Sequence, residues 1–175
     1  MSVFDILYSM KHKIIRKQNN SAMCMVCGVE NKFTLNSRFY ELENRELAVA
    51  FRVCDWHQSY PERVHGGILA AVLDELIGRS LCIEEPGMWG VTVELSIKYK
   101  KPVPTESDLK AVARITKNSR KLFEGTGELL LPDGSVAASA WGKYMKLPIE
   151  KISGKEFSEN EWFLLDERDP EEFEI

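Results

Sequence analysis

The alternation of apolar and polar residues predicts six strands and one long helix. In the second predicted strand, residues 45–53, alternate residues from Leu47 to Val53 form one apolar face, as in a half-buried strand. Residues 66–84 are apolar nearly all round and are followed by Pro86, which indicates a buried helix. The five other predicted strands are residues 32–42, 89–103, 109–117, 121–131 and 135–147.

A helix that is apolar on nearly every side must be covered by other elements. A long antiparallel sheet curled around it would do so, and the order of two strands, one helix and four strands therefore predicts an α+β domain over residues 22–148. Before it, a near-helical spacing of apolar residues predicts an amphipathic N-terminal helix within residues 1–21. After it, residues 149–175 are expected to be an acidic tail with a frayed end, in which Trp162–Leu165 pack on the domain.

Composition and charge fit one soluble domain. The chain has 175 residues, of which 44% are hydrophobic and 29% charged, and its net charge of −4 gives no reason to expect a nucleic acid partner. No apolar run reaches the roughly 18 residues of a membrane span. The first residues also lack a secretory signal pattern, so we expect a cytoplasmic protein with free thiols. The charge is uneven: residues 1–20 carry four lysines or arginines and one acid, whereas residues 150–175 carry ten acids and three lysines or arginines.

The predicted central helix carries two adjacent acids, Asp74 and Glu75. Arg79 lies four residues after Glu75 and can pair with it. The residues on the helical stripe of Asp74 are small or apolar, so none of them can neutralise its carboxylate. An unpaired buried carboxylate is costly or is pushed toward protonation, and such groups gather at reactive sites. Asp74 is therefore a candidate catalytic carboxylate, unless a donor on another element holds it for a structural purpose.

Two glycines, Gly66 and Gly67, begin the same helix. The first turn of a helix presents N–H groups without partners, and glycine lets a substrate carbonyl approach them, so the pair could build an oxyanion hole. The alternative is that the glycines relieve crowding where the helix meets the sheet. Gly66 precedes Asp74 by eight residues, or about 12 Å along a helix. A base and an oxyanion donor must both lie within about 3 Å of the reacting group, so if both act, they come from two copies of the chain at a twofold interface.

Several motifs agree in order and spacing with one known family. HQSYPERVHGGILAAVLDE (residues 57–75) resembles the signature of hotdog-fold acyl-CoA thioesterases of the PaaI type, in which an acid follows nine residues after the histidine of His-Gly-Gly. GVTVELSIKYKKPVP (90–104) resembles the third strand of that family, and CMVCGVEN (24–31) is similar to its Cys-x-x-Cys-Gly-x-x-Asn lead-in. The resemblance covers residues 22–147 and implies the hotdog fold, a curved antiparallel sheet around one long central helix.

The resemblance implies that the protein hydrolyses an acyl-CoA thioester and needs no cofactor. Asp74 would attack the thioester carbon or activate a water. The Gly66 amide of the partner subunit would polarise the carbonyl, and Thr92 would help to hold the attacking water. The partners implied are the acyl-CoA and a second copy of the chain in a homodimer, which could pair further into a tetramer.

The remaining expected site residues would bind the substrate. His65 is expected to fix the loop before the helix. Where other members of the family have an asparagine that assists the oxyanion, this chain has Ser59, so its neighbours Gln58 or His57 would substitute. Lys117 and Arg120 are candidates for contact with the CoA phosphates, although two solvated turn charges would look the same. The full expected substrate-binding set is His57, Gln58, Ser59, His65, Gly67, Lys117 and Arg120.

Three other readings compete with the thioesterase. A related hotdog dehydratase is disfavoured, because the chain lacks the Pro and the Glu that such enzymes carry around this helix. A non-catalytic scaffold that binds acyl-CoA would retain Asp74 for structure. A zinc-stabilised binding module is the third, because the chain holds two pairs of zinc-ligand types with suitable spacing: Cys24, Cys27, Cys54 and His57.

Overall fold

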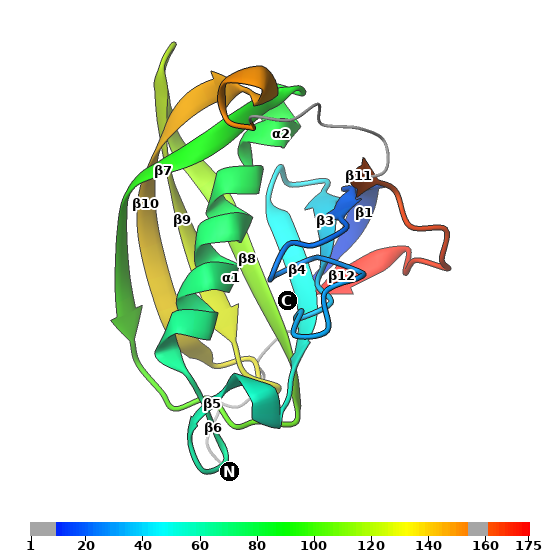
Figure 1. The fold of residues 1–175 in the computed structure, drawn as a ribbon, viewed down its shortest axis with the longest axis vertical. Helices are drawn as coiled ribbons and strands as arrows, with labels where there is room; N and C mark the ends of the chain where they lie inside the picture. The colour runs from blue at the N-terminus through cyan, green and yellow to red at the C-terminus, as the bar shows by residue number, and fades with distance from the viewer. Residues whose placement is uncertain (1–9, 154–160) are drawn as a thin grey trace.

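The computed structural model describes residues 10–153 and 161–175, and in it one curved antiparallel sheet wraps a single long helix (Figure 1). The sheet has eight strands in the order β12-β1-β3-β4-β8-β9-β10-β7. Helix α1 (Gly66–Arg79) lies on its concave face, and the short helix α2 (Leu81–Glu84) follows it. The expected α+β hotdog arrangement is therefore confirmed.

Most of the strands lie close to their predicted ranges. The strands of the large sheet are β1 (Lys11–Lys17), β3 (Arg38–Leu42), β4 (Leu47–Val53), β7 (Met88–Tyr99), β8 (Ser107–Asn118), β9 (Leu122–Leu130), β10 (Val136–Pro148) and β12 (Glu172–Glu174). Two short pairs lie outside that sheet: β2 (Asn20–Ser21) with β11 (Trp162–Phe163), and β5 (Gln58–Tyr60) with β6 (Arg63–Val64). Single-turn helices lie at Asp55–His57 and Ile149–Lys151.

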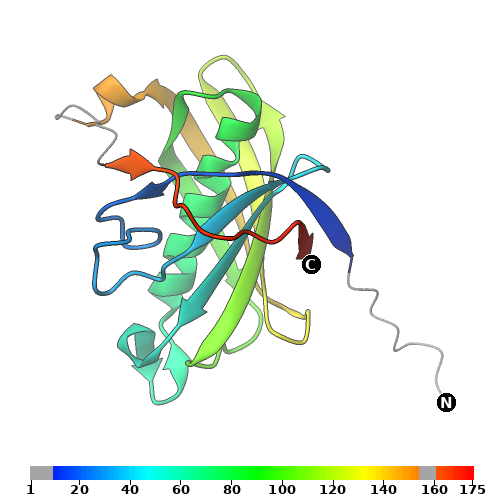
Figure 2. The same ribbon diagram turned by 90° about the vertical axis from the view of Figure 1, so that its right-hand side faces the viewer.

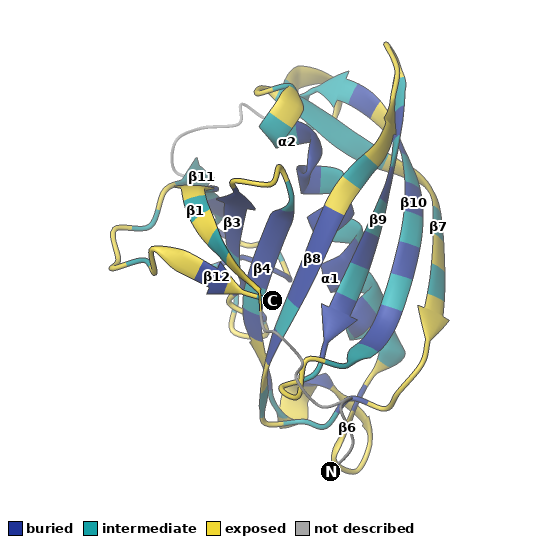
Figure 3. Cartoon of the chain, turned by 180° about the vertical axis from the view of Figure 1, so that it is seen from behind, coloured by how far each residue is buried: buried dark blue, intermediate teal, exposed yellow. Residues whose placement is uncertain are grey.

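The hydrophobic core lies between α1 and the inner face of the sheet. Leu73, Leu76 and Ile77 of the helix have no exposed surface and belong to the main core cluster. Figure 3 shows the central strand β4 mostly buried, β8 buried in its first half and exposed at its end, and the edge strand β7 without a buried residue. Gly125 of β9 lets the helix approach the sheet, because a Cβ there would lie 2.7 Å from the Ile77 side chain. No helix in the described ranges is long and apolar enough to cross a bilayer.

The predicted N-terminal helix is wrong where the structure describes it. Residues Lys11–Lys17 form strand β1, which pairs with β3, and the rest of the predicted helix, residues 1–9, lies outside the described residues. Over so short a run the apolar spacing fits a strand as well as a helix. The edge of β3 decides, because pairing there gives the backbone groups of both strands their partners. Ile14 then packs on a second, smaller cluster that includes Phe173.

The acidic C-terminal segment is paired to its last residue, so the expected frayed end is also wrong. Strand β12 pairs with β1, Phe173 is buried, and the Ile175 N–H donates to the Met10 carbonyl oxygen (2.9 Å). Figure 2 shows the other short strand of this segment, β11, beside β2. The expected packing of Trp162–Leu165 is confirmed for Trp162, whose ring contacts that of Trp89 with centroids 4.9 Å apart, and wrong for Leu164, which is 60% exposed.

The uneven charge of the chain has a structural explanation. The basic first strand lies against the acidic last segment, and the Lys17 Nζ, on a side chain only 6% exposed, lies 2.8 Å from Glu167 and 2.9 Å from Asp169. Lys11 and Glu172 form a more exposed pair at 3.5 Å. An exposed pair such as Lys11–Glu172 contributes only about 0–1 kcal/mol, whereas the buried Lys17 ammonium is compensated by Glu167 and Asp169.

Candidate active site

Asp74 lies in the middle of α1, next to strands β7 and β10. The Thr92 hydroxyl donates to Asp74 Oδ1 (2.9 Å), and the Tyr144 hydroxyl donates to the same oxygen (3.0 Å). Both donors use Oδ1, so Oδ2 has no hydrogen-bond partner within residues 10–153 and 161–175. The sequence-based view of Asp74 as unpaired needs correction: the helix offers it no donor, but two strands of the sheet do.

Tyr144 is the site residue that sequence reasoning missed. Its ring is buried and stacks on Phe123, with centroids 4.9 Å apart and planes 15° apart. Burial, together with the adjacent Asp74 carboxylate, raises the pKa of Tyr144 well above its ordinary range, so the hydroxyl stays protonated and donates. In the sequence, Tyr144 is one more core aromatic on an alternating strand, and no local signal sets it apart.

A β-bulge in β7 brings Thr92 to Asp74. The pairing of β7 with β10 runs from Glu94 opposite Lys143 directly to Thr92 opposite Tyr144, and Val93 is skipped. If the strand alternated strictly, the side chains of Thr92 and Leu95 would lie on opposite faces of the sheet. The extra residue reverses the alternation, so that Thr92 and Leu95 both face the helix, and the Val93 side chain is 55% exposed. Strict alternation along the predicted strand 89–103 would put Val91, Val93, Leu95, Ile97 and Tyr99 on one apolar face, and it fails at this point.

A cavity of about 100 Å³ opens beside the carboxylate. Residues from α1, β7 and β10 line it, together with Cys82 of α2, and they include Trp89 and Gly90 next to the two donors. A water molecule occupies about 30 Å³ in the liquid. The cavity therefore has room for water beside Asp74 but not for an acyl chain within this single chain.

Glu75 is occupied elsewhere, as the spacing predicted. The Arg79 Nε donates to Glu75 Oε1 (2.7 Å), and its Nη1 donates to the Asn19 carbonyl oxygen (2.8 Å). The guanidinium lies between two aromatic rings, 4.2 Å from the centroid of Phe39 and 4.4 Å from that of Trp162. Of the two adjacent acids, Glu75 is thus held in an ion pair with Arg79, whereas the printed donors to Asp74 are two neutral hydroxyls.

The N-terminus of α1 presents one backbone donor. His65 is the cap, and its Nδ1 accepts the Gly67 N–H (2.8 Å), so this histidine holds the first turn of the helix. The Tyr99 hydroxyl donates to the Gly66 carbonyl oxygen (2.9 Å). The Gly66 N–H, at the first helical position, has no acceptor among the described residues. It is therefore available to a substrate oxygen.

Known protein families give an independent comparison for the candidate site. Residues 62–138, which contain Gly66, Asp74 and Thr92, match the model of the thioesterase superfamily. This segment is similar to that superfamily, and the chain as a whole has the hotdog fold. Among curated proteins, the chain is 31% identical over 97 residues to an uncharacterised Schizosaccharomyces pombe protein, covering 55% of each chain. It is 32% identical over 95 residues to the acyl-coenzyme A thioesterase THEM4 of Mus musculus, covering 54% of this chain and 40% of that protein.

Solved structures of other proteins have the same fold as this chain. A thioesterase superfamily protein, RHA08564, superposes with a TM-score of 0.64 at 24% identity, over 70% of this chain and 59% of that one. The Escherichia coli PaaI protein superposes at 0.59 with 17% identity, over 65% and 80%. A Streptococcus pneumoniae protein crystallised with coenzyme A superposes at 0.55 with 20% identity, over 59% and 82%. The aligned segments span less than two thirds of either curated relative.

The other expected substrate-binding residues lie in two separate places, near the start of α1 and at the turn between β8 and β9. Gln58 and Ser59 are exposed on β5. His57 is buried, its Nδ1 accepts the Cys54 N–H (3.1 Å), and its Nε2 lies 3.2 Å from the Phe33 carbonyl oxygen. With both nitrogens used inside the protein, His57 drops out of the expected substrate-binding set.

The two basic candidates, Lys117 and Arg120, lie at the opposite end of the fold from His57. Lys117 and Arg120 are exposed at the turn between β8 and β9, and the Lys117 Nζ lies 3.6 Å from Glu124. Asn118 in the same turn donates to Glu84 (2.7 Å), which places the turn at the α2 end of the fold. The two cations are therefore separated from Gly66 by the length of α1.

The four zinc ligands expected from the sequence do not come together in the structure. Among the described residues, metal-ligand atoms gather within 4.8 Å of one another only for Cys24, Cys27 and Glu75. Cys54 instead lies against His57, with its Sγ 3.5 Å from Nδ1. The four-residue set is therefore wrong, because the two pairs with suitable sequence spacing belong to different parts of the fold.

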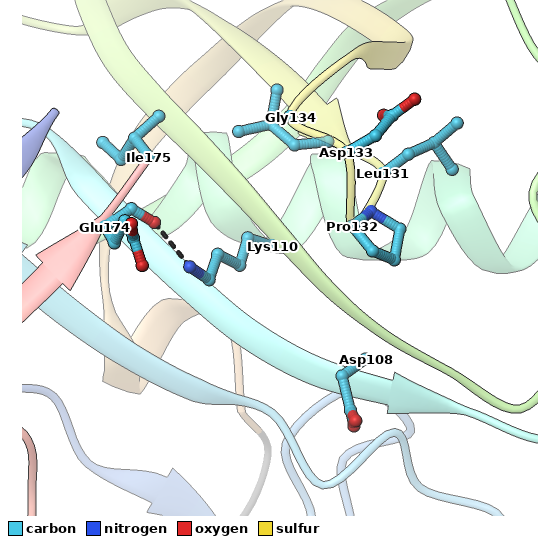
Figure 4. Close-up of a pocket in the computed structure, with 9 residues that line it drawn as sticks. Asp108, Lys110, Leu131, Pro132, Asp133, Gly134, Glu174 and Ile175 are labelled. Carbon is cyan, nitrogen blue, oxygen red and sulfur yellow. Dashed lines mark hydrogen bonds between the residues drawn. The ribbon is translucent and has the colours of Figure 1, made fainter. Parts of the chain in front are cut away.

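A second hollow on the molecule lies apart from Asp74. It has a volume of about 310 Å³ and forms where β8, the turn between β9 and β10 and the C-terminal strand meet (Figure 4). The Lys110 Nζ crosses it and donates to the Glu174 carbonyl oxygen (2.7 Å). None of the expected site residues lines it.

The two donors to Asp74 can be tested by removing their hydroxyls. Thr92→Val and Tyr144→Phe are each expected to lower kcat for thioester hydrolysis about tenfold with little change in KM, because a hydrogen bond to a charged group contributes about 1.5–3 kcal/mol. Steady-state kinetics of the purified variants make the measurement, and urea unfolding checks that both remain folded. An unchanged kcat in both variants would exclude a role for these donors in positioning Asp74.

Proposed function

We propose that this protein hydrolyses the thioester of an acyl-coenzyme A to a free acid and coenzyme A, with Asp74 as its catalytic carboxylate. The observation that carries the proposal is the asymmetric environment of that side chain. Oδ1 accepts two hydroxyl donors, whereas Oδ2 has no partner among the described residues and lies at a cavity that has room for water. A carboxylate fixed in this way is oriented for reaction rather than for structure alone.

Two routes follow from this geometry. As a general base, Oδ2 takes a proton from water while the water oxygen attacks the thioester carbon. The tetrahedral intermediate then expels the coenzyme A thiolate, which takes the proton back from Asp74. As a nucleophile, Oδ2 attacks the carbon itself and expels the thiolate, and water hydrolyses the resulting anhydride. Thr92 and Tyr144 hold the carboxylate in either route, and Thr92 can also contact the water.

The Gly66 N–H of a partner subunit is proposed to stabilise the oxyanion. Within one helix, Gly66 and Asp74 are about 12 Å apart, too far to serve one carbonyl. A helix N-terminus with a free N–H suits an oxygen on which negative charge develops. Two copies related by a twofold axis would bring the Gly66 of each chain to the Asp74 of the other and create two equivalent sites.

Strand β7 supports dimer formation. It is the last strand of the sheet, it has 12 residues, and its single partner in the sheet is β10. It exposes apolar side chains, with Val93 55% and Tyr99 54% accessible. A long exposed edge strand is normally covered in a stable protein, and Tyr99 already contacts Gly66 at this edge. We therefore expect a homodimer with β7 at the interface, in solution as in the active enzyme.

Coenzyme A is proposed as the thiol because of two proteins to which the chain is similar. One of the curated relatives is named an acyl-coenzyme A thioesterase, and one of the solved structures was determined with coenzyme A. Lys117 and Arg120 remain the proposed contacts for the CoA phosphates, and Gln58, Ser59, His65 and Gly67 the proposed contacts near the thioester.

A panel of acyl-CoA substrates tests the proposed function. The purified chain is incubated with acetyl-, butyryl-, octanoyl-, palmitoyl- and phenylacetyl-CoA, and free coenzyme A is quantified by chromatography. We expect turnover of at least one substrate and a dimer by light scattering. Binding without hydrolysis across the panel would favour the non-catalytic scaffold, and a fully active monomer would exclude the shared active site.

A further inference from the structure

Cys24 and Cys27 lie in a tight turn between β2 and β3, close to the C-terminal half of α1. The Gly28 N–H donates to the Cys24 carbonyl oxygen (2.7 Å), and the Val26 N–H donates to the Cys24 sulfur (3.3 Å). The turn requires glycine after the second cysteine, because a Cβ at Gly28 would lie 2.3 Å from the Cys24 carbonyl oxygen. The two sulfurs and a carboxylate oxygen of Glu75 all lie within 4.8 Å of one another. Both thiols are free.

The two cysteines have different environments. Cys27 has no exposed surface, and the Arg79 Nη2 donates to its sulfur (2.9 Å). Cys24 is only partly buried. The hydrogen bond from the Cys27 thiol lowers the pKa of Cys24 to about 6, against the opposing effects of burial and the Glu75 carboxylate. The same hydrogen bond, with burial, raises the pKa of Cys27, although Arg79 acts in the other direction.

We propose that Cys24 and Cys27 are a reversible dithiol–disulfide pair, with Cys24 as the attacking and Cys27 as the resolving residue. The turn places the two sulfurs within 4.8 Å of each other, and of the two residues only Cys24 has exposed surface. These are the features of a cysteine pair that reacts by thiol–disulfide exchange. The oxidant is a small-molecule disulfide such as oxidised glutathione.

The exchange balances in two steps. The Cys24 thiolate attacks one sulfur of the oxidant, the S–S bond of the oxidant breaks, and one glutathione thiolate leaves. The Cys27 thiol then gives its proton to solvent and attacks the Cys24 sulfur, which expels the second glutathione thiolate. Two protein thiols are oxidised to one disulfide, and one small-molecule disulfide is reduced to two thiols.

The charges around the pair favour a disulfide over a bound metal ion. Glu75 completes a group of three metal-ligand types with the two cysteines. However, the Arg79 guanidinium already donates to both Glu75 Oε1 (2.7 Å) and the Cys27 sulfur (2.9 Å), and so supplies the positive charge at this place. The other two cysteines have other neighbours, Cys54 beside His57 and Cys82 with its sulfur 3.9 Å from the Met88 carbonyl oxygen.

Intact-mass measurement of reduced protein incubated with oxidised glutathione tests the pair. The background is Cys54→Ser/Cys82→Ser, so that the pair supplies both remaining thiols. We expect this protein to lose two hydrogens without retaining glutathione. Adding Cys27→Ser should trap one glutathione on Cys24, whereas adding Cys24→Ser should slow glutathione uptake at least tenfold, because the Cys27 sulfur is buried. The oxidation rate of the Cys24–Cys27 protein, which keeps the Cys27 thiol that lowers the pKa of Cys24, should follow a titration near pH 6 rather than near the ordinary thiol value of about 8.5.

Three results would overturn the proposal. The first is a Cys24–Cys27 protein that stops at the glutathione adduct or does not react. The second is equal trapping in the two single-cysteine variants. The third is zinc in the purified wild-type protein that blocks alkylation of both thiols until a chelator removes it, which would make the pair a metal site with Glu75.

Discussion

Asp74→Asn is expected to lower kcat for acyl-CoA hydrolysis at least about 100-fold, the contribution of a positioned general base or nucleophile. The fold should persist, because the amide oxygen of asparagine can take the place of Oδ1 and accept the Thr92 and Tyr144 hydroxyls. The change is then confined to Oδ2, where a carboxylate oxygen becomes an NH₂ group that can neither accept a proton nor attack. Chromatography of released coenzyme A gives the rate.

The matched control for this variant is Glu75→Gln. It removes the neighbouring acid from the same helix and leaves an amide oxygen for the Arg79 hydrogen bond. We expect it to keep kcat within a few-fold of the parent. Parent-like turnover of Asp74→Asn, with an unfolding midpoint equal to that of the control, would remove Asp74 from the catalytic machinery.

Gly66→Pro is expected to cause a loss of similar size, about 100- to 1000-fold in kcat, because loss of one oxyanion donor costs that much in well-studied enzymes. Proline is tolerated at the first position of a helix, and the residue before it must be extended. His65 already has φ −65° and ψ 132°, so the substitution removes the N–H and keeps the helix. Gly66→Ala is the control, since it retains the N–H and its Cβ would lie 3.4 Å from the Tyr99 ring.

Mixing the two inactive variants tests whether the site is shared between chains. A heterodimer of Asp74→Asn and Gly66→Pro would combine the intact Asp74 of one chain with the intact Gly66 of the other, and so regain one of its two sites. After complete subunit exchange, verified with an affinity tag on one variant, about a quarter of the parent activity should return. A mixture that contains heterodimers and stays inactive would show that both groups act within one chain.

The local pattern of the chain predicts the layers of the fold well and its edges poorly. The apolar face of β4 and the range of α1 follow from periodicity, because burial acts on each residue separately. Residues Lys11–Lys17 are different: their state depends on the open edge of β3 and on β12, which lies more than 150 positions later. No window of the sequence contains that information, and tertiary pairing overrides the helical spacing.

The candidate site shows the same division. Asp74 and Gly66 stand out in the sequence, because an acid and two glycines are unusual in an apolar helix. The support of Asp74 does not stand out, because it depends on Tyr144 from a distant strand and on a bulge that skips Val93. A bulge inserts one residue without any change in composition, so strict alternation assigns Thr92 to the wrong face. The expected zinc ligands illustrate a related limit. The pairs Cys24–Cys27 and Cys54–His57 have the same spacing in the sequence, but they lie in different parts of the fold.

The pairing of β1 with β12 also bears on how the protein is made. The Thr92–Asp74–Tyr144 cluster is complete once residue 144 has left the ribosome. The outer edge of β1, however, has no partner until Glu172–Glu174 have been synthesised. During translation the first strand therefore presents an open edge and four lysines or arginines, and the acidic end closes that edge last. A chain interrupted after Pro148 would keep the catalytic cluster but leave that edge open to other chains, with aggregation as the consequence.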